Sequence, residues 1–482
     1  MHWIDGVWKE GTGVPFVSKN PHTQEAIWHG KVASKKEIDE AIEAAKGAFL
    51  KWCQLGFQRR AVIVSAFGEC VETHKEDFAK IISEEVGKPL WESRAEVAAV
   101  KNKIDISIQS YQERCSMRKQ ALAHGASIVR HRPHGVVAVF GPFNFPAHLP
   151  NGHIIPALLA GNSIVFKPSE YTPAVAEEMV RLWIEAGLPE GVINLVQGGQ
   201  EVGQTIVQSQ QINGLFFTGS AAVGKEIARQ SLEFPQRILA LEMGGNNPLV
   251  ISAIEDIHAA VLLTIQSAFL SAGQRCSCAR RLFIVETSTT NEFLKHLIDT
   301  TESIAIGPYT MNPEPFMGPL ITVDAANRLR DVVQKLTSKG KLLTKRILDD
   351  LPQTYFLPTL VDMTGKEIED AEYFGPILQI KKCLTFEEAV EEANNTAYGL
   401  SSGLISTNSE EFSYFLEHIR AGIVNWNSPL TGALSSAPFG GIGKSGNYRP
   451  SAYYAADYCS YPVASIEAQY SKEPIPQGIT FV

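Results

Sequence analysis

The chain has 482 residues, which is too long for a single hydrophobic core, so we expect two or three domains. Its composition is that of a globular protein, with 44% hydrophobic and 20% charged residues. The net charge of -9 argues against nucleic acid or an anionic membrane as a main partner. The apolar runs are broken by Pro, Asn or Gly well short of a membrane span, and the N-terminus lacks the pattern of an export signal.

Seven cysteines are scattered along the chain, at positions 53, 70, 115, 276, 278, 383 and 459. Because their number is odd and no CxxC pair or His cluster accompanies them, free thiols in a reduced, cytoplasmic protein are favoured over a disulfide framework. The same spacing argues against a zinc site, and we expect no bound metal.

The first quarter of the chain predicts a helical scaffold. Residues 1–30 predict short strands and turns, whereas capping boxes at Ser34 and Thr73 predict helix starts. Three helices are expected, over residues 34–52, 73–86 and about 92–113. Residues 127–132 alternate between apolar and polar side chains, which predicts either a ribbon that pairs with another subunit or a plain surface hairpin.

From Pro133 onward, buried strands alternate with helices, which predicts a doubly wound parallel sheet. The expected strands cover residues 136–140, 163–166, 195–197 and 215–217, and the expected helices cover 174–186 and 223–230. Ligands bind at the carboxyl ends of such strands, so this part is interpreted as a nucleotide-binding domain. A second alternation, from about residue 245 to 429, with strands at 282–285, 374–380 and 422–425, predicts a second α/β domain.

One cysteine stands out as a candidate nucleophile. It lies in the run Gly273-Gln274-Arg275-Cys276-Ser277-Cys278, between a helix-like stretch and a strand-like one. A thiol attacks a carbonyl carbon as the thiolate, and Arg275 and Arg280 would favour that anion. The alternatives for Cys276 are a buried structural thiol or half of a metal site.

Two turns of the nucleotide-binding part carry polar residues suited to a dinucleotide. In Lys167-Pro168-Ser169-Glu170, an acid just past a strand end accepts hydrogen bonds from ribose hydroxyls and repels a 2′-phosphate, which favours NAD over NADP. A solvated turn is the alternative. In the run from Phe217 to Gly224, a glycine turn precedes a helix whose N-terminus suits a pyrophosphate. Gly219, Gly224 and Lys225 also have P-loop spacing, but Glu226 replaces the magnesium-binding Ser or Thr and argues against an NTPase.

Two further side chains are candidates for acid–base and oxyanion roles. Glu242 stands beside Gly244 and Gly245, and a general base that works on water needs the room that glycines leave. Asn144 stands between aromatic and proline residues directly after a strand, where a rigid amide stabilises an oxyanion. The alternatives are a surface acid and an Asn turn.

Taken together, these stretches resemble the aldehyde dehydrogenase superfamily over nearly the whole chain. Seven family motifs occur in the right order: P-W-N-F-P at Pro142 to Pro146, K-P-S-E at Lys167 to Glu170, F-T-G-S at Phe217 to Ser220, E-L-G-G at Glu242 to Gly245, G-Q-x-C at Gly273 to Cys276, E-x-F-G-P at Glu372 to Pro376 and P-F-G-G-x-G-x-S-G at Pro438 to Gly446. Seven ordered motifs are a very specific signal.

The resemblance implies a role for each motif. Cys276 attacks an aldehyde carbon, Asn144 with the Cys276 backbone N–H holds the oxyanion, NAD accepts a hydride, and Glu242 activates the water that hydrolyses the thioester. Cys278 is expected to be a spectator. The residues expected to contact NAD are Lys167, Ser169, Glu170, Gly203, Gly219, Ser220, Ala221, Ala222, Val223, Gly224, Glu372 and Phe374.

Departures from the general family pattern resemble one subgroup, which serves arginine catabolism in bacteria and acts on a semialdehyde with two carboxylates. Asn246 replaces the usual lysine and Phe143 the usual tryptophan. Because the chain is acidic overall, the carboxylates need local cations, and Arg275, Arg280 and Arg449 are candidates or else structural ion-pair partners. The alternatives are oxidation of glutamate or succinate semialdehyde, or a catalytically silent binding protein, against which the intact Cys276, Glu242 and Asn144 argue.

The expected fold class is α/β, with a doubly wound parallel-sheet NAD-binding domain, a second α/β catalytic domain and a small β ribbon for oligomerisation. The resemblance places the NAD-binding domain at residues 1–115 and 133–244, the catalytic domain at 245–437 and bridging segments at 116–132 and 438–482. It also implies a homodimer or homotetramer.

Overall fold

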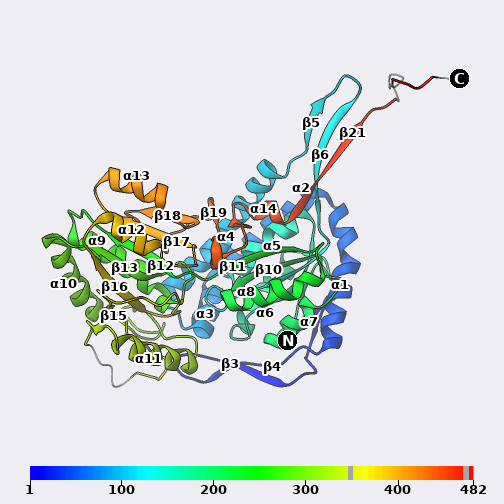
Figure 1. Ribbon diagram of the computed structural model, residues 1–482. Coiled ribbons are helices and arrows are strands. Elements are labelled where there is room, and N and C mark those ends of the chain that lie inside the picture. The colour runs from blue at the N-terminus through cyan, green and yellow to red at the C-terminus, as the bar shows by residue number, and fades with distance from the viewer. Residues whose placement is uncertain (346–350, 471–476, 481–482) are drawn as a thin grey trace.

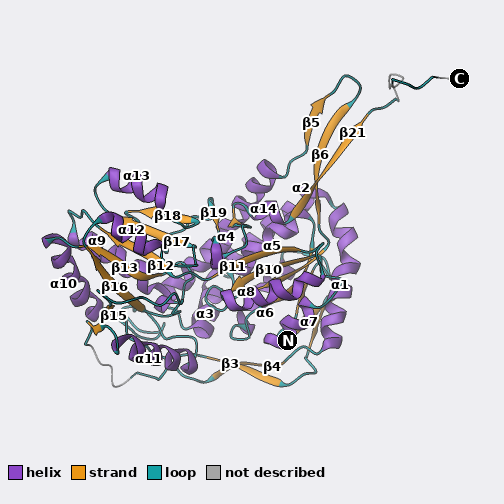
Figure 2. Ribbon diagram, viewed as in Figure 1, coloured by secondary structure: helices purple, strands orange, loops and turns teal. Residues whose placement is uncertain are grey.

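Two seven-stranded sheets form the body of the chain, and a three-stranded sheet projects from it (Figure 1). The computed structural model describes residues 1–345, 351–470 and 477–480. Helices flank the strands of both large sheets in Figure 2, so the α/β class expected from the sequence is confirmed. Over these described ranges, no helix is both long and apolar enough to span a lipid bilayer.

The first sheet has a parallel core with the strand order β11-β10-β7-β8-β9, which β1 and β2 extend in antiparallel fashion. Its strands are β1 (His2–Ile4), β2 (Val7–Lys9), β7 (Val136–Phe140), β8 (Ser163–Lys167), β9 (Ile193–Leu195), β10 (Gly214–Gly219) and β11 (Ile238–Met243). The strand order changes direction at β7, and doubly wound sheets bind ligands at the carboxyl ends of strands beside such a point.

Helices cover both faces of this sheet. They are α1 (Lys35–Gln54), α2 (Gly56–Thr73), α3 (Lys75–Val86), α4 (Leu90–Arg114), α5 (His148–Ala160), α6 (Pro173–Glu185), α7 (Gln200–Val207) and α8 (Ala221–Gln230), followed by the short helix η1 (Ser231–Glu233). Because side chains alternate along a strand, Val137 and Val139 pack in a cluster with α2 to α6, whereas Val136 and Ala138 pack with α1 and α7. Burial on both faces explains why β7 is apolar throughout.

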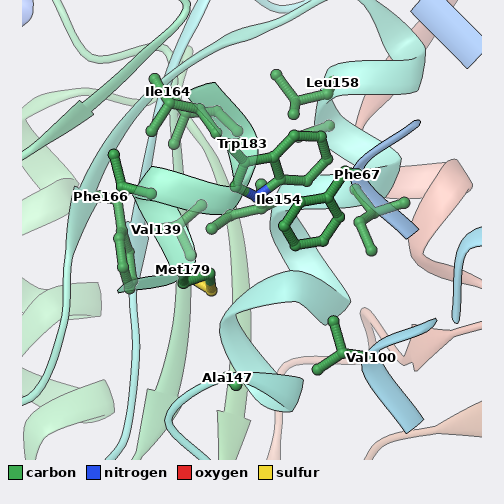
Figure 3. Close-up of a cluster of buried hydrophobic side chains, with 14 of the residues drawn as sticks. Phe67, Val100, Val139, Ala147, Ile154, Leu158, Ile164, Phe166, Met179 and Trp183 are labelled. Carbon is green, nitrogen blue, oxygen red and sulfur yellow. The ribbon is translucent and has the colours of Figure 1, made fainter. Parts of the chain in front are cut away.

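Figure 3 shows the centre of the first cluster. Phe67 of α2 and Trp183 of α6 stack with their ring centroids 3.7 Å apart. Val139, Phe166 and Ile154 surround them from β7, β8 and α5, and burying each such side chain stabilises the fold by about 1.5–3 kcal/mol. This packing fixes α4 and α5 against the strand ends that carry the candidate site.

The second sheet has the order β14-β15-β16-β13-β12-β17-β18 and is parallel except for β14. Its strands are β12 (Asn247–Ile251), β13 (Ala279–Val285), β14 (Lys341–Leu342), β15 (Thr359–Asp362), β16 (Ile377–Cys383), β17 (Ser401–Ile405) and β18 (Ile423–Trp426). Its helices are α9 (Ile257–Phe269), η2 (Leu270–Gly273), α10 (Ser288–Ser303), α11 (Val323–Thr337), α12 (Phe386–Asn394) and α13 (Ser409–His418).

The projecting sheet joins two segments that are far apart in sequence. Its antiparallel strands are β5 (Arg118–Ala121), β6 (Ala126–Pro133) and β21 (Ser460–Glu467). The remaining elements are the hairpin β3 (Pro15–Lys19) and β4 (Ala26–Lys31), the pair β19 (Pro438–Phe439) and β20 (Ser451–Ala452), η3 (Gly443–Ser445) and α14 (Ala455–Tyr458). The proposed bridging segments, 116–132 and 438–482, contain β5, β19, β20, β21 and all of β6 except Pro133. Residues 471–476 and 481–482 lie outside the described part of the chain.

Several local expectations need correction. The second capping box is wrong, because α2 runs through Thr73, whose hydroxyl donates to the Glu69 carbonyl oxygen, and α3 begins only at Lys75. The strand expected at 195–197 ends at Leu195, and the one expected at 374–380 begins at Ile377. The domain boundaries remain a prediction.

Candidate active site

The carboxyl ends of β7, β8, β10 and β11 open onto a cavity of about 890 Å³. On the far side, the cavity is closed by α11 and by residues 372–374, which belong to the half of the chain built on the second sheet. Cys276, Glu242 and Asn144 all line it, although up to 132 residues separate them along the chain (276 − 144 = 132). The structure therefore brings the three expected catalytic groups together.

An unusual backbone turn presents Cys276 to the cavity. After α9, Ser271, Ala272 and Gly273 adopt φ values of 53°, 55° and 67°, which is the left-handed region that costs most residues free energy. A β-carbon at Gly273 would lie 2.3 Å from the carbonyl oxygen of Gly375, so only glycine fits there. The turn lies between α9 and β13, so Cys276 is on the loop that joins these two elements, as expected.

Two buried side chains hold this loop by its carbonyl groups. Asn247 Nδ2 donates to the carbonyl oxygens of Cys276, at 2.7 Å, and Cys278, at 2.8 Å. Arg280 donates to the carbonyl oxygens of Gly273 and Arg275 from the same loop, at 2.7 and 2.9 Å. Since a buried carbonyl without a partner is costly, these contacts fix the backbone that carries the nucleophile.

The thiol of Cys276 is protonated at neutral pH. Burial is the largest of the causes that raise its pKa to about 12; the nearby Glu242 and Glu372 carboxylates also raise it, whereas Arg280 lowers it. The expectation that Arg275 and Arg280 favour the thiolate is therefore wrong, because burial and the two carboxylates outweigh Arg280. Arg275 lowers the pKa of Cys278 and not that of Cys276. Attack by Cys276 needs a group that accepts the thiol proton.

Glu242 is such a group. It ends β11 next to Met243 and is only 4% exposed. Burial raises its pKa to about 8, while a hydrogen bond from the Ser451 N–H to Oε1, at 3.1 Å, and the charge of Lys103 lower it. Oε2 has no hydrogen-bond partner among the described residues. A carboxyl group with a pKa near the working pH can both take and release protons.

Asn144 lies in the turn between β7 and α5, and a buried ion pair holds that turn. Its Nδ2 donates to the carbonyl oxygen of Gln274, at 2.8 Å, so the amide lies against the nucleophile loop. Lys88 pairs with Glu96 and donates to the Asn144 carbonyl oxygen at 3.0 Å. Glu96 in turn accepts from the backbone N–H of Ala147 at 2.9 Å. The amide is thus held in place, as oxyanion stabilisation requires.

The opposite end of the cavity is shaped to hold a dinucleotide. Lys167 is buried and donates to the carbonyl oxygens of Pro168 and Gly198, so its ammonium group is fixed beside the β8 turn. Ser220 caps α8 by accepting from the Val223 N–H at 3.3 Å, which leaves a helix N-terminus on the cavity wall. A β-carbon at Gly203 would lie 3.8 Å from the Lys167 side chain and would narrow this end.

Most residues expected to contact the cofactor line the cavity. The ten that do are Lys167, Ser169, Glu170, Gly203, Gly219, Ser220, Ala222, Val223, Glu372 and Phe374. Ala221 and Gly224 of α8 do not line it. Gly224 packs against β11, where a β-carbon would lie 2.3 Å from the sulfur of Met243. Glu372 Oε1 accepts from the Gly245 N–H at 3.1 Å, which fixes that carboxylate.

The three arginines expected to bind substrate do not line the cavity. Arg280 is 1% exposed, and its two terminal guanidinium nitrogens donate to three backbone carbonyl oxygens, so it is a structural residue, contrary to expectation. Arg275 pairs with the buried Glu92 and also bonds Ser271. Arg449 is exposed, and its hydrogen bond goes to the carbonyl oxygen of the adjacent Tyr448. Arg449 is therefore the one of the three that remains available.

Sequence reasoning missed the residues that hold the site from behind. Asn247, Lys88 and Glu96 were not singled out, because an Asn beside a strand and a charged helix surface carry no distinctive spacing. His153 was also missed, although its Nδ1 is bonded to Tyr458 Oη at 2.7 Å and its Nε2 to Thr218 Oγ1 at 3.0 Å.

Comparison with known proteins places this geometry in a family. The sequence profile of the aldehyde dehydrogenase family matches residues 8–462. The chain belongs to the aldehyde dehydrogenase family. N-Succinylglutamate 5-semialdehyde dehydrogenase from Burkholderia lata is 51% identical over 468 residues, which cover 97% of this chain and 96% of the relative. The resemblance to that subgroup is thereby confirmed, and an aldehyde is the substrate class of the family.

Solved structures of other family members superpose closely. Betaine aldehyde dehydrogenase from Staphylococcus aureus in complex with NAD+ has a TM-score of 0.92 and 27% identity, covering 100% of this chain and 97% of that one. An NADP-dependent enzyme from Escherichia coli has a TM-score of 0.90 and 27% identity, covering 97% and 98%. The fold is thus shared by proteins whose cofactors differ by one phosphate, so the side chains must make that choice.

Proposed function

We propose that this chain oxidises N-succinylglutamate 5-semialdehyde to N-succinylglutamate in the cytoplasm, with NAD as the hydride acceptor, as a step of arginine catabolism. The observation that carries the proposal is the meeting of Cys276, Glu242 and Asn144 in one cavity. The substrate is taken from the relatives that are 51% identical over 97% of the chain.

The first step is attack of Cys276 on the aldehyde carbon. The sulfur forms a bond to carbon while the thiol proton passes to the Glu242 carboxylate, because a thiol whose pKa is raised to about 12 needs a base. The carbonyl oxygen becomes an oxyanion, which Asn144 Nδ2 and the Cys276 backbone N–H hold. The product of this step is a thiohemiacetal on Cys276.

NAD fits the end of the cavity that the first sheet forms. Lys167, Glu170 and the N-terminus of α8 would hold the adenosine ribose and the pyrophosphate, and Glu372 with Phe374 would hold the nicotinamide half. When bound, NAD supplies a hydride acceptor, which the conversion of the thiohemiacetal into a thioester requires. Glu170 favours NAD, because a 2′-phosphate beside its carboxylate would be repelled.

Hydrolysis of the thioester completes the cycle. Glu242, once it has passed the thiol proton to solvent, removes a proton from water, and the hydroxyl attacks the thioester carbon. The carbon–sulfur bond then breaks, the carboxylic acid leaves and the Cys276 thiol re-forms. A carboxyl group with a pKa of about 8 is ionised often enough near neutral pH to serve as this base.

The substrate's two carboxylates need cations outside the cavity. Arg449 is exposed and has no ion-pair partner among the described residues, so it is the proposed ligand for one carboxylate. Arg449→Gln should raise KM for the dianionic semialdehyde by about tenfold and leave KM for a neutral aldehyde unchanged. An equal change for both aldehydes would count against the assignment.

The proposed assembly is a homodimer or homotetramer, formed through the projecting sheet of the bridging segments. Edge strands β5 and β21 present unpaired backbone groups, and Ile466 on β21 is 78% exposed. Ile466→Glu should lower the mass measured by light scattering. Leu416→Glu, at an exposed position on α13, is the matched control and should leave the mass unchanged.

The decisive experiment compares semialdehydes. NADH formation from N-succinylglutamate 5-semialdehyde, glutamate 5-semialdehyde, succinate semialdehyde and a neutral aliphatic aldehyde gives four values of kcat/KM. The proposal expects the first to be highest by tenfold or more. A preference for glutamate or succinate semialdehyde would support the alternative substrates, and a preference for the neutral aldehyde would reject a dianionic substrate altogether.

A further inference from the structure

One buried cation behind the cavity has no role in the reaction as described so far. Lys103 lies on α4 and is 3% exposed, and its Nζ makes no hydrogen bond or ion pair with any described residue. By contrast, Lys101, two residues earlier on the same helix, pairs at the surface with Glu72 at 2.9 Å. Burying an ammonium group without a partner is costly, so its presence calls for a function.

The surroundings of Lys103 leave its charge without local neutralisation. His148 and His153 on α5 face it. Burial, with the Lys103 charge as a second cause, lowers the pKa of both rings to about 3, so both rings are neutral. Gly152 lies between them in sequence, and a β-carbon there would be 4.0 Å from Lys103 Nζ. The glycine leaves the space beside the ammonium group free of side-chain atoms.

Glu242 lies on the strand next to this group, because His153 Nε2 is bonded to Thr218 Oγ1 at 3.0 Å and Thr218 pairs in register with Glu242. The opposite charge that acts on Lys103 is that of Glu242. Around Glu242, the Ser451 N–H binds Oε1, and the titratable groups that respond to its charge are Cys276 and Tyr458, which are both neutral at working pH. Neither can stabilise an anion by charge. Among the described residues, Lys103 is the cation that favours the ionised form of Glu242.

We propose that Lys103 is a positioning residue that keeps the Glu242 carboxylate ionised for thioester hydrolysis, from behind the cavity and without touching the substrate. The inference rests on the proposed function, because it needs Glu242 to act as the base. It also explains the burial of the lysine, since an ammonium group screened from water acts more strongly on a nearby carboxylate than one at the surface. Lys103 does not line the cavity, which separates it from the groups that contact substrate.

The effect of the charge is measurable as a shift in a pH profile. Without Lys103, only the hydrogen bonds from Ser451 would oppose the effect of burial, and the pKa of the Glu242 carboxyl group would rise by about one unit. One unit is a factor of ten in the ionised fraction well below the pKa, so hydrolysis at pH 7 would slow by about tenfold. Attack by Cys276 on the aldehyde uses the same carboxylate and would slow as well, so the release of acid has to be followed as a separate step.

The experiment follows acid release from the thioester by rapid quench, after the NADH burst, between pH 6 and 10. In the pH profile of the hydrolysis rate, Lys103→Met should move the acid limb to higher pH by about one unit. Lys103→Arg, which retains the charge, should restore the limb at least in part, and Lys101→Met should leave it in place. Lys103→Gln repeats the test if the Met variant does not fold.

The outcomes separate this inference from the proposed function. A wild-type protein that forms no NADH from any aldehyde would overturn both. An active wild type with an unshifted limb in Lys103→Met and Lys103→Gln would overturn the role of Lys103 alone. A raised KM for the semialdehyde with an unshifted limb would assign Lys103 to substrate binding instead.

Discussion

Asn247 donates a hydrogen bond to the carbonyl oxygen of the nucleophile Cys276, at 2.7 Å, and is itself fixed because its Oδ1 accepts from the Ser401 N–H at 3.0 Å. A strand of the second sheet thus positions the backbone that presents the thiol. Since Cys276 follows three left-handed residues, the loop needs such external support.

Asn247→Ala should therefore lower kcat by about 10- to 100-fold, because a misplacement of about 1 Å at the reacting atoms costs up to about that much. NAD affinity, measured by isothermal titration, should stay within about threefold. The three lost hydrogen bonds should also reduce the free energy of unfolding by about 1–3 kcal/mol. Asn246→Ala is a control, since the neighbouring amide donates to Asp370, and a kcat loss of the same size there would argue against a specific role for Asn247.

Alkylation should report the protonated state of Cys276. Because burial raises the pKa of the thiol to about 12, its reaction with iodoacetamide should rise about tenfold per pH unit between pH 7 and pH 10 without levelling off. Mass spectrometry of the peptide that contains Cys276 measures the rate, and Cys276→Ser should abolish the labelling. A plateau below pH 9 would show that the thiol ionises far more easily than this environment implies.

Much of this site follows from the sequence because its parts are carried by turns. Asn144 follows β7, and Lys167 and Gly219 end β8 and β10. The carboxyl ends of parallel strands meet at one edge of a sheet, so the convergence of these residues is predictable. Glu242 was harder to place, because β11 begins half-buried and was not recognised as a strand.

The supporting residues could not be predicted, because their partners depend on how helices, strands and loops pack together in three dimensions. Lys88 and Lys103 look alike in the sequence, as lysines in or next to charged helices, yet Lys88 meets Glu96 and Lys103 meets no carboxylate within bonding distance. Likewise, the spacing of Arg280 from Cys276 indicated a role in the site. Only the packing shows that backbone carbonyl groups occupy its guanidinium group.

Glu242→Gln should stop the reaction after the hydride step. An amide cannot take a proton from the thiol or from water, so we expect a slowed but stoichiometric burst of NADH, followed by a steady rate lower by about 10²- to 10⁴-fold. Stopped-flow absorbance measures the burst, and mass spectrometry detects the acylated Cys276 peptide. A burst as fast as that of the wild type would show that another group takes the thiol proton in the first step.

Glu170→Ala should relax the choice of cofactor. Removing the carboxylate removes the repulsion of a 2′-phosphate, so the ratio of kcat/KM for NADP over NAD should rise by about tenfold or more. Glu178→Ala, on the outer side of α6 and away from the cavity, is the matched control and should leave the ratio unchanged. An unchanged ratio in Glu170→Ala would place the discrimination elsewhere in the cavity.

The buried Glu242 and Lys103 should also shape the dependence of stability on pH. For Glu242, the pKa is about 8 in the folded chain against an ordinary 4.5, so the folded chain binds more protons between those values and the free energy of unfolding falls as pH rises. For Lys103, the pKa is lowered from 10.5 to about 8, so the unfolded chain binds more protons between pH 8 and 10.5 and the free energy of unfolding rises with pH. Together, the two groups predict that their joint contribution to the free energy of unfolding is lowest near pH 8.

Variants isolate the two parts of this curve. At about 1.4 kcal/mol per pKa unit, Glu242→Gln should be more stable than the wild type by a few kcal/mol at pH 8 and nearly equal to it at pH 4.5. Lys103→Met should lack the rise above pH 8. Denaturant unfolding at half-unit pH steps measures both differences. A Glu242→Gln variant whose advantage grows toward low pH would have the opposite sign, and would mean that the carboxylate is stabilised by the fold even without substrate.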